Sequence, residues 1–176
     1  MTIRYSTVGI VGTGAMGRGI AQIAAQAGST VQLFDLNPEA CRQAHAAITA
    51  QWDKLQDKGR IDAATADAYK TRLQTAASLG DLHNCDLVVE AAVERLDIKQ
   101  SLFAQLEDIV RPDAVLVTNT SSLSVTAIAA GLKRPAQFAG YHFFNPVPLM
   151  KVVEVIAGLK TDAAVCAGLT EYARQM

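Results

Sequence analysis

The stretch Val8-Gly-Ile-Val-Gly-Thr-Gly-Ala-Met-Gly17 decides the fold predicted for this chain. Its first four residues form a short apolar run that predicts a β-strand. Residues 16–27 form an alanine-rich run that predicts a helix, and Gly28 predicts where this helix ends. Between strand and helix, residues 12–17 match the pattern G-x-G-x-x-G. The stretch therefore predicts a strand, a tight glycine turn and a helix in direct succession.

The glycine turn has the features of a phosphate-binding loop. Gly12 permits the tight turn, Gly14 leaves room for a diphosphate, and Gly17 lets the helix pack closely on the strand. Unpaired amides at the start of the helix, next to Ala15 and Met16, attract negative charge. We therefore expect these five residues to bind the diphosphate of a dinucleotide. A turn of small residues without any ligand is the alternative.

An acidic residue at the end of the next strand favours the ligand-binding alternative. Residues 30–35 predict that strand, which completes a β-α-β unit, and Asp35 ends it. A carboxylate at this place accepts hydrogen bonds from the ribose hydroxyls of a dinucleotide and disfavours a 2'-phosphate. The sequence therefore predicts that NAD, rather than NADP, is the cofactor.

The remaining chain alternates between strand and helix patterns. Alternation of this kind requires crossover connections, and hence a mostly parallel sheet with helices on both faces. The prediction is an α/β, Rossmann-type doubly wound domain over residues 1–158, with an antiparallel helical hairpin inserted at about 40–73. The predicted strands are 86–92, 115–118, 138–142 and 152–156, and the predicted helices are 40–58, 62–73, 97–110, 124–132 and 161–176, with Thr161 as the cap of the last one.

Composition narrows the function classes. Of the 176 residues, 50% are hydrophobic and 19% are charged, which predicts a folded domain and excludes a disordered chain. The formal net charge of -1 gives no reason to expect a nucleic acid or a membrane surface as partner. Three widely separated cysteines predict neither a disulfide framework nor a metal site. Without a signal-peptide pattern, we expect a cytoplasmic protein.

Four stretches together resemble the NAD-binding domain of the 3-hydroxyacyl-CoA dehydrogenases, including the 3-hydroxybutyryl-CoA dehydrogenases. They are residues 8–22, Val-Val-Glu-Ala-Ala-Val-Glu at 88–94, Thr-Asn-Thr-Ser-Ser-Leu at 118–123 and His-Phe-Phe-Asn-Pro at 142–146. The resemblance implies reversible oxidation of an (S)-3-hydroxyacyl-CoA to a 3-oxoacyl-CoA with NAD, in fatty acid β-oxidation or aromatic-compound degradation. It covers the chain from the first strand to about residue 156.

The resemblance also implies roles for individual residues. His142 resembles the base that takes the proton of the 3-hydroxyl, Glu154 its carboxylate partner, and Ser121 the residue that binds the substrate oxygen. A histidine is suited to this role because it exchanges a proton near neutral pH, and a carboxylate stabilises the resulting cation. The residues that resemble contacts to the cofactor are Ala91, Glu94, Lys99, Asn119, Ser121 and Asn145, and Asn145 also resembles a substrate contact.

Several of these residues have plainer alternatives. From the residues alone, His142 is a structural histidine at a strand end, and Glu154 points to solvent. Residues 118–123 are then a turn that caps the following helix. Glu94 and Lys99 are charges on a solvated helix.

The tip of the predicted hairpin is basic. The resemblance places this hairpin near the phosphates of coenzyme A, so Lys54 and Lys58, with Arg60 nearby, are predicted substrate contacts. A charged helix surface is the alternative. Residues 159–176 are expected to be the first helix of a truncated all-helical domain that forms a homodimer when complete. Its apolar residues Val165, Leu169 and Tyr172 are therefore expected to be poorly packed.

Two other functions are the alternatives. One is an NAD-binding module without catalysis, such as a crystallin-like relative or an inactive fragment. The other is a Rossmann dehydrogenase for free β-hydroxyacids, which is disfavoured because that group uses a catalytic lysine in an interdomain helix, and this chain has no visible counterpart.

Overall fold

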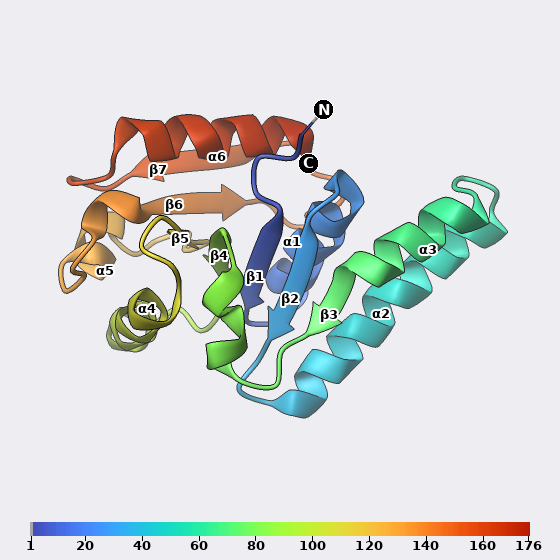
Figure 1. Cartoon of the computed structure of the whole chain (residues 1–176), viewed down its shortest axis with the longest axis horizontal. Helices are drawn as coiled ribbons and strands as arrows, with labels where there is room; N and C mark the ends of the chain where they lie inside the picture. Colours follow the sequence, from blue (N-terminus) through green and yellow to red (C-terminus); the bar gives the residue numbers. More distant parts are fainter. Residues whose placement is uncertain (1) are drawn as a thin grey trace.

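The sheet of this domain has seven strands in the order β3-β2-β1-β4-β5-β6-β7, as the computed structural model of residues 2–176 shows (Figure 1). The first six strands in this order are parallel, and β7 runs antiparallel to β6. The strand order reverses between β1 and β4, which creates a crevice at the carboxyl ends of these strands. The strands are β1 (Thr7–Val11), β2 (Thr30–Phe34), β3 (Leu73–Thr75), β4 (Leu87–Glu90), β5 (Val115–Thr118), β6 (Phe138–Phe143) and β7 (Val153–Ala157).

Helices cover both faces of the sheet. α1, α6 and the base of the hairpin formed by α2 and α3 pack on one face, and α4, α5 and η1 pack on the other. This arrangement confirms the predicted doubly wound fold. The α-helices are α1 (Ala15–Ala27), α2 (Pro38–Asp57), α3 (Ala63–Arg72), α4 (Leu96–Ile109), α5 (Val125–Ala129) and α6 (Ala163–Gln175), and the 3-10 helices are η1 (Leu79–Asn84) and η2 (Pro135–Gln137). No helix within residues 2–176 is long and apolar enough to cross a membrane.

The hairpin extends away from the sheet, as Figure 1 shows. Its two helices are held together by Trp52 of α2, a fully buried residue whose ring packs against that of Tyr69 of α3 with the centroids 5.6 Å apart. The second predicted helix of the hairpin, 62–73, is one residue too long at each end: Asp62 is the N-cap of α3, and Leu73 begins β3, with its side chain buried beside β2. The six-residue helix η1 was not predicted, and α5 ends at Ala129, three residues before the predicted end.

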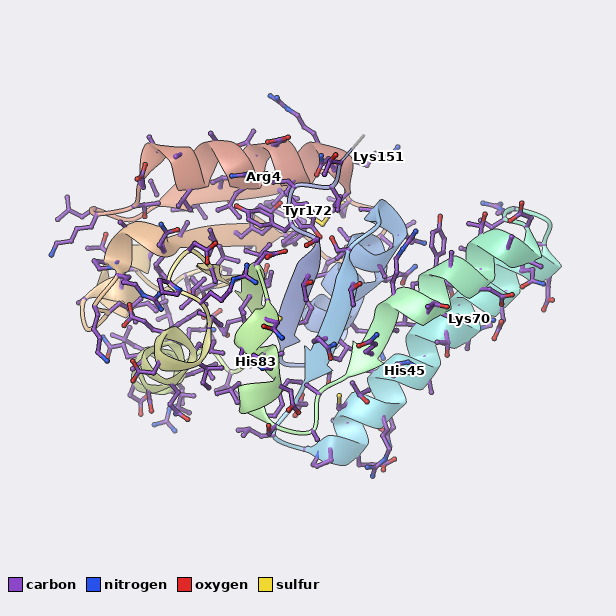
Figure 2. All side chains as sticks on the ribbon, in the orientation of Figure 1. Arg4, His45, Lys70, His83, Lys151 and Tyr172 are labelled. Atoms are coloured by element: carbon purple, nitrogen blue, oxygen red, sulfur yellow. The ribbon has the colours of Figure 1, made fainter. Side chains whose placement is uncertain are left out.

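The expectation that α6 is poorly packed is wrong. Val165, Leu169 and Tyr172 are all buried, because α6 lies along β6 and β7. The Tyr172 hydroxyl is 2.8 Å from the hydroxyl of Ser29, and the Tyr141 hydroxyl donates a hydrogen bond to the carbonyl of Leu169. Figure 2 shows Tyr172 beneath α6, next to the N-terminal segment. The sheet itself therefore covers the apolar face of this helix.

The cap of α6 also differs from the prediction. Asp162, not Thr161, is the N-cap, and its carboxylate accepts a hydrogen bond from the amide of Ala164. Thr161 instead donates to the carbonyl of Phe138 and accepts from the amide of Gly158. Its hydroxyl thus fastens the turn between β7 and α6 to the start of β6.

Candidate active site

At two positions of the glycine turn, only glycine avoids a collision with the backbone. Gly12 has a φ of +96°, and a Cβ atom there would lie 2.6 Å from the carbonyl oxygen of Ala91. A Cβ atom at Gly17 would lie 1.8 Å from the carbonyl oxygen of Gly12. At Gly14, by contrast, a Cβ atom would meet no heavy atom within 4 Å. Two glycines thus allow the backbone to pack, and the third borders open space at the start of α1.

The N-terminus of α1 has no side chain to satisfy its first amides. Gly14 is the N-cap, and the first turn contains no acidic residue. Four other α-helices have a side-chain cap, supplied by Asn37, Asp62, Ser124 and Asp162. The unpaired amides and the helix dipole of α1 favour an anion. This helix end therefore fits the diphosphate of NAD.

Asp35 lies opposite this helix end. Its carboxylate accepts hydrogen bonds from the amide and hydroxyl of Thr13, at 2.9 and 2.8 Å, and from the amide of Asn37 at 2.9 Å. Partial burial opposes ionisation, but these hydrogen bonds outweigh it and lower the pKa of Asp35. The group is therefore a carboxylate at neutral pH, as recognition of ribose hydroxyls requires.

A cleft of about 720 Å³ begins at the glycine turn and Asp35. The cleft is mostly apolar, and the residues that line it include Leu36, Val93, Ile98 and Leu102. Leu36 is 91% exposed, so nothing in the described chain covers it. Such a cleft fits a flat heterocycle next to the ribose site. Sequence reasoning missed Leu36 and Val93, although a leucine between Asp35 and a polar helix cap is a visible signal.

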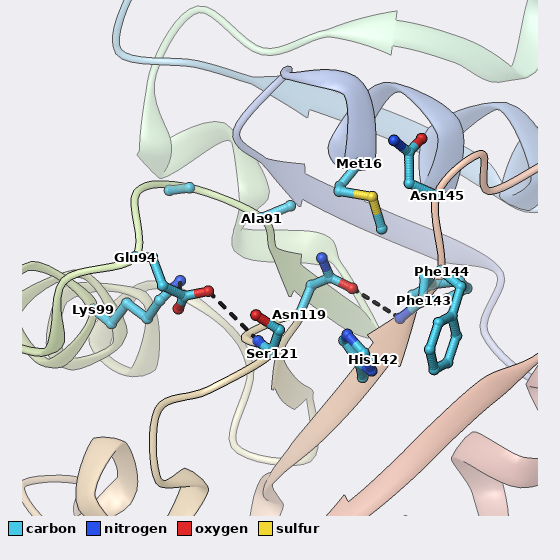
Figure 3. Close-up of a pocket in the computed structure, with 11 residues that line it drawn as sticks. Met16, Ala91, Glu94, Lys99, Asn119, Ser121, His142, Phe143, Phe144 and Asn145 are labelled. Carbon is cyan, nitrogen blue, oxygen red and sulfur yellow. Dashed lines mark hydrogen bonds and ion pairs between the residues drawn. The ribbon is translucent and has the colours of Figure 1, made fainter.

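A second pocket, of about 330 Å³, lies at the carboxyl ends of β4, β5 and β6 (Figure 3). It brings together most of the residues that the resemblance singled out, although they are far apart in the sequence. Those that line it are Met16, Ala91, Glu94, Lys99, Asn119, Ser121, His142 and Asn145. Lys54, Lys58 and Arg60 are exposed on the hairpin and do not line this pocket.

Strand register places His142 beside Glu154. The two residues are paired in the antiparallel ladder of β6 and β7, so their side chains share one face of the sheet. His142 Nδ1 is 3.1 Å from Glu154 Oε2. Because a carboxylate only accepts hydrogen bonds, Nδ1 holds the proton and Nε2 of the neutral ring is left as the acceptor. The ring of Phe144 packs edge-on against the imidazole, with the centroids 4.7 Å apart.

Two polar residues from the end of β5 complete this side of the pocket. The side-chain oxygen of Asn119 accepts a hydrogen bond from the amide of Phe143 at 2.9 Å, so its NH2 group is left to donate elsewhere (Figure 3). The amide of Ser121 is 3.5 Å from a carboxylate oxygen of Glu94. Asn119 therefore ties β5 to β6, and Glu94 ties the loop after β4 to Ser121.

Lys99 is not the surface charge that the residues alone allowed, whereas Glu94 is 44% exposed. Lys99 is only 2% exposed, and its ammonium lies 2.5 Å from a carboxylate oxygen of the fully buried Glu90 and 3.6 Å from Glu94. Burial raises the pKa of Glu94, but the hydrogen bond from Thr120 and the charge of Lys99 outweigh it, so the net shift is downward. Sequence reasoning missed Glu90.

Within residues 2–176, no group of three or more His, Cys, Asp or Glu residues is arranged to hold a metal ion.

The glycine turn, Asp35 and the two pockets along the switch point define an NAD-binding Rossmann domain of a dehydrogenase. The chain belongs to the 3-hydroxyacyl-CoA dehydrogenase family, whose NAD-binding domain matches residues 7–176. It is 46% identical over 97% of its length to 3-hydroxyadipyl-CoA dehydrogenase of Escherichia coli, and 44% identical over 96% to a probable 3-hydroxybutyryl-CoA dehydrogenase of Deinococcus radiodurans. The matched segments make up 36% and 60% of these relatives, respectively.

A solved structure of 3-hydroxybutyryl-CoA dehydrogenase from Escherichia coli K12 has the same fold. It superimposes with a TM-score of 0.95 at 43% identity, and the match covers 99% of this chain and 37% of that one. The chain thus spans between about a third and three fifths of the length of these relatives. Family membership and the NAD-binding domain are established by these matches.

Proposed function

We propose that this domain belongs to an enzyme that reversibly oxidises an (S)-3-hydroxyacyl-CoA to a 3-oxoacyl-CoA with NAD. The observation that carries the proposal is the contact of 3.1 Å between His142 Nδ1 and Glu154, which leaves Nε2 as the acceptor on a pocket wall shared with Ser121 and Asn119. A base, a hydroxyl donor and an amide donor thus line one small pocket next to the dinucleotide cleft.

Each residue of the pocket then has a chemical task. His142 Nε2 accepts the proton of the 3-hydroxyl, and Glu154 stabilises the imidazolium that forms. Ser121 donates a hydrogen bond to the substrate oxygen, and Asn145 contacts both substrate and cofactor. NAD, when bound, would supply the hydride acceptor for C3. Glu94, Lys99 and Asn119 hold its nicotinamide half.

A third groove supports a coenzyme A ester as substrate. It has a volume of about 500 Å³, lies between α1, α2 and residues 145–149, and shares Asn145 with the pocket of His142. Gln51 on α2 lines it, and one and two turns further along the chain come the exposed Lys54 and Lys58. We propose that the acyl thioester lies in the groove and that these lysines face the phosphates of coenzyme A.

The longer relatives support a proposal about the wider setting. We propose that a helical domain follows α6 and completes the acyl site and a homodimer, and that the protein works in the cytoplasm. The names of the relatives include a hydroxybutyryl and a hydroxyadipyl substrate. Both a short monocarboxylic and a dicarboxylic acyl chain are therefore to be tested.

The test has two parts. In the first, calorimetry on the 176-residue chain measures NADH binding. In the second, a chimera joins this chain to the part of the Deinococcus relative that the match does not cover, and loss of NADH absorbance measures its turnover. The substrates are acetoacetyl-CoA, 3-oxoadipyl-CoA and free acetoacetate, and we expect turnover with the thioesters only. NADH binding without any turnover would instead support a binding module. Turnover of the free acid at the same rate would contradict the role of coenzyme A.

A further inference from the structure

Glu90 is a buried acid that the reaction described above does not use. Its carboxylate is fully buried at the end of β4. It accepts hydrogen bonds from three different parts of the domain: the amide of Ala92 at 2.7 Å, the hydroxyl of Thr118 at 2.7 Å and the ammonium of Lys99 at 2.5 Å. One charged group therefore joins the loop after β4, the end of β5 and the first turns of α4.

Lys99 connects this buried acid to the pocket. Its ammonium is 3.6 Å from Glu94 Oε1, which also accepts a hydrogen bond from the hydroxyl of Thr120 at 2.5 Å. The other oxygen of Glu94 faces the amide of Ser121 at 3.5 Å. Two carboxylates thus compete for one ammonium, and Glu90 makes the shorter contact. Because Lys99 is closer to Glu90, Glu94 is left to bind Thr120 and Ser121.

We propose that Glu90 is a positioning residue for the nicotinamide half of NAD, acting through Lys99 and Glu94 on Ser121. The inference rests on the function proposed above. A buried ammonium without a counter-charge is costly, so Lys99 needs a carboxylate partner. When Glu90 loses its charge, Glu94 is the remaining acid within reach of Lys99. The ammonium then draws Glu94 away from Thr120 and Ser121, and this wall of the pocket is displaced.

The variant Glu90→Gln tests this step. Glutamine keeps one oxygen to accept the hydrogen bond of Ala92, removes the charge, and replaces the other oxygen by an NH2 group that the Thr118 hydroxyl can accept from. Calorimetry compares two probes: NADH, and ADP-ribose, which keeps the diphosphate and both riboses but lacks the nicotinamide ring. We expect the affinity for NADH to fall about tenfold, as for other coupled networks, while the affinity for ADP-ribose stays within about twofold. Equal losses for both probes, or unchanged NADH binding, would overturn the proposal.

A matched control separates positioning from general stability. Glu107, at the other end of α4, is 6% exposed, accepts hydrogen bonds from the amides of Lys133 and Arg134, and pairs with the Arg134 guanidinium. Glu107→Gln is expected to lower stability and to leave both affinities unchanged. A selective loss of NADH binding in this control would contradict the role of Glu90.

A milder variant covers the case in which Glu90→Gln does not fold. Thr118→Val removes the hydrogen bond to Glu90 and the acceptor of the longer hydrogen bond from the Thr120 amide, at 3.3 Å, without changing the charge or the shape of the side chain. It is expected to weaken NADH about two- to fivefold and ADP-ribose not at all; equal effects on both would again overturn the inference. If the unmodified chain binds neither probe, the proposed function fails. If it binds both and Glu90→Gln changes neither affinity, the positioning role alone fails.

Discussion

The two ends of the parallel strands differ in how far their polar groups are hydrogen-bonded within the protein. At the amino ends, Asp86 accepts hydrogen bonds from the amide and hydroxyl of Ser6, the amide of Thr7 and the guanidinium of Arg111, at 2.5 to 2.9 Å. At the carboxyl ends, the first amides of α1 have no side-chain cap, and Nε2 of His142 has no hydrogen bond within residues 2–176. Asp86 at the amino ends is satisfied by the protein itself, whereas at the carboxyl ends paired groups such as Glu90 lie beside groups that are left for a ligand.

This difference separates stability from function. Polar groups that are already paired contribute to folding, and their removal costs free energy of unfolding. Polar groups without a partner in the protein do not contribute a hydrogen bond to folding, and they can bind a ligand instead. These groups line the crevice at the switch point of the sheet. Substitutions at the carboxyl ends should therefore reduce turnover or cofactor binding, and substitutions at the amino ends should reduce stability alone.

The largest effect is expected for His142→Gln. Glutamine has no basic nitrogen, so turnover of acetoacetyl-CoA by the chimera should fall about 10²- to 10⁴-fold. NADH affinity should not change, because the substituted atoms face the substrate. The matched control is His83→Gln, since His83 lies in η1, does not line the pocket, and has its Nδ1 atom 3.1 Å from the carbonyl oxygen of Gly80. Equal losses in both variants would refute the assignment of the base.

A smaller effect, on affinity, is expected for Gly14→Asp. The backbone at Gly14 has a φ of -65°, which any residue adopts, so aspartate can cap α1. The free energy of unfolding should rise by about 0.5 to 1 kcal/mol. The new charge competes with the diphosphate for the same amides, so NADH affinity should fall about 10²- to 10³-fold.

Gly14→Ala is the control for this variant, because it adds a methyl group to the same open space without any charge. A smaller loss of NADH affinity is expected for alanine than for aspartate. Calorimetry and urea unfolding measure both properties. If aspartate raised stability and left NADH affinity intact, the uncapped helix end would not be the diphosphate site.

Features specified locally could be predicted from the sequence. The glycine turn requires glycine at Gly12 and Gly17 because a Cβ atom would collide with backbone, and Asp35 follows at a fixed distance. The pairing of His142 with Glu154 depends on the register of β6 and β7. Residue patterns alone did not reveal that register, and only the resemblance brought the two together.

Features that depend on tertiary contacts were missed or misjudged. Lys99, Phe103 and Leu106 have the spacing of residues on one face of a helix, and this face is buried in α4. The spacing therefore indicated a buried position for Lys99, but a lysine is usually exposed. Its burial depends on Glu90, which belongs to a different element. Val165 and Leu169 were expected to lack partners, because the sequence does not show that β6 and β7 lie beneath them.

The smallest effect, and the one that tests the other end of the strands, is expected for Asp86→Asn. Burial opposes ionisation, but hydrogen bonds from Ser6, Arg111 and Thr7 lower the pKa of Asp86 below its usual value. The folded state therefore favours the carboxylate, and this contribution is present above the unfolded pKa of about 4 and lost as the pH falls through the lower folded pKa. At pH 7 the variant should unfold about 1 to 3 kcal/mol more easily.

Urea unfolding of the Asp86→Asn variant and the parent at pH 7 and pH 3 measures this contribution. The difference in free energy of unfolding should shrink at the lower pH, while NADH affinity at pH 7 stays the same. Asp113→Asn is the control, because Asp113 pairs with the same Arg111 but is 77% exposed, and exposed ion pairs contribute little. A loss of NADH affinity in Asp86→Asn would mean that the two ends of the strands are coupled, and that stability and binding are not separated as the hydrogen bonding indicates.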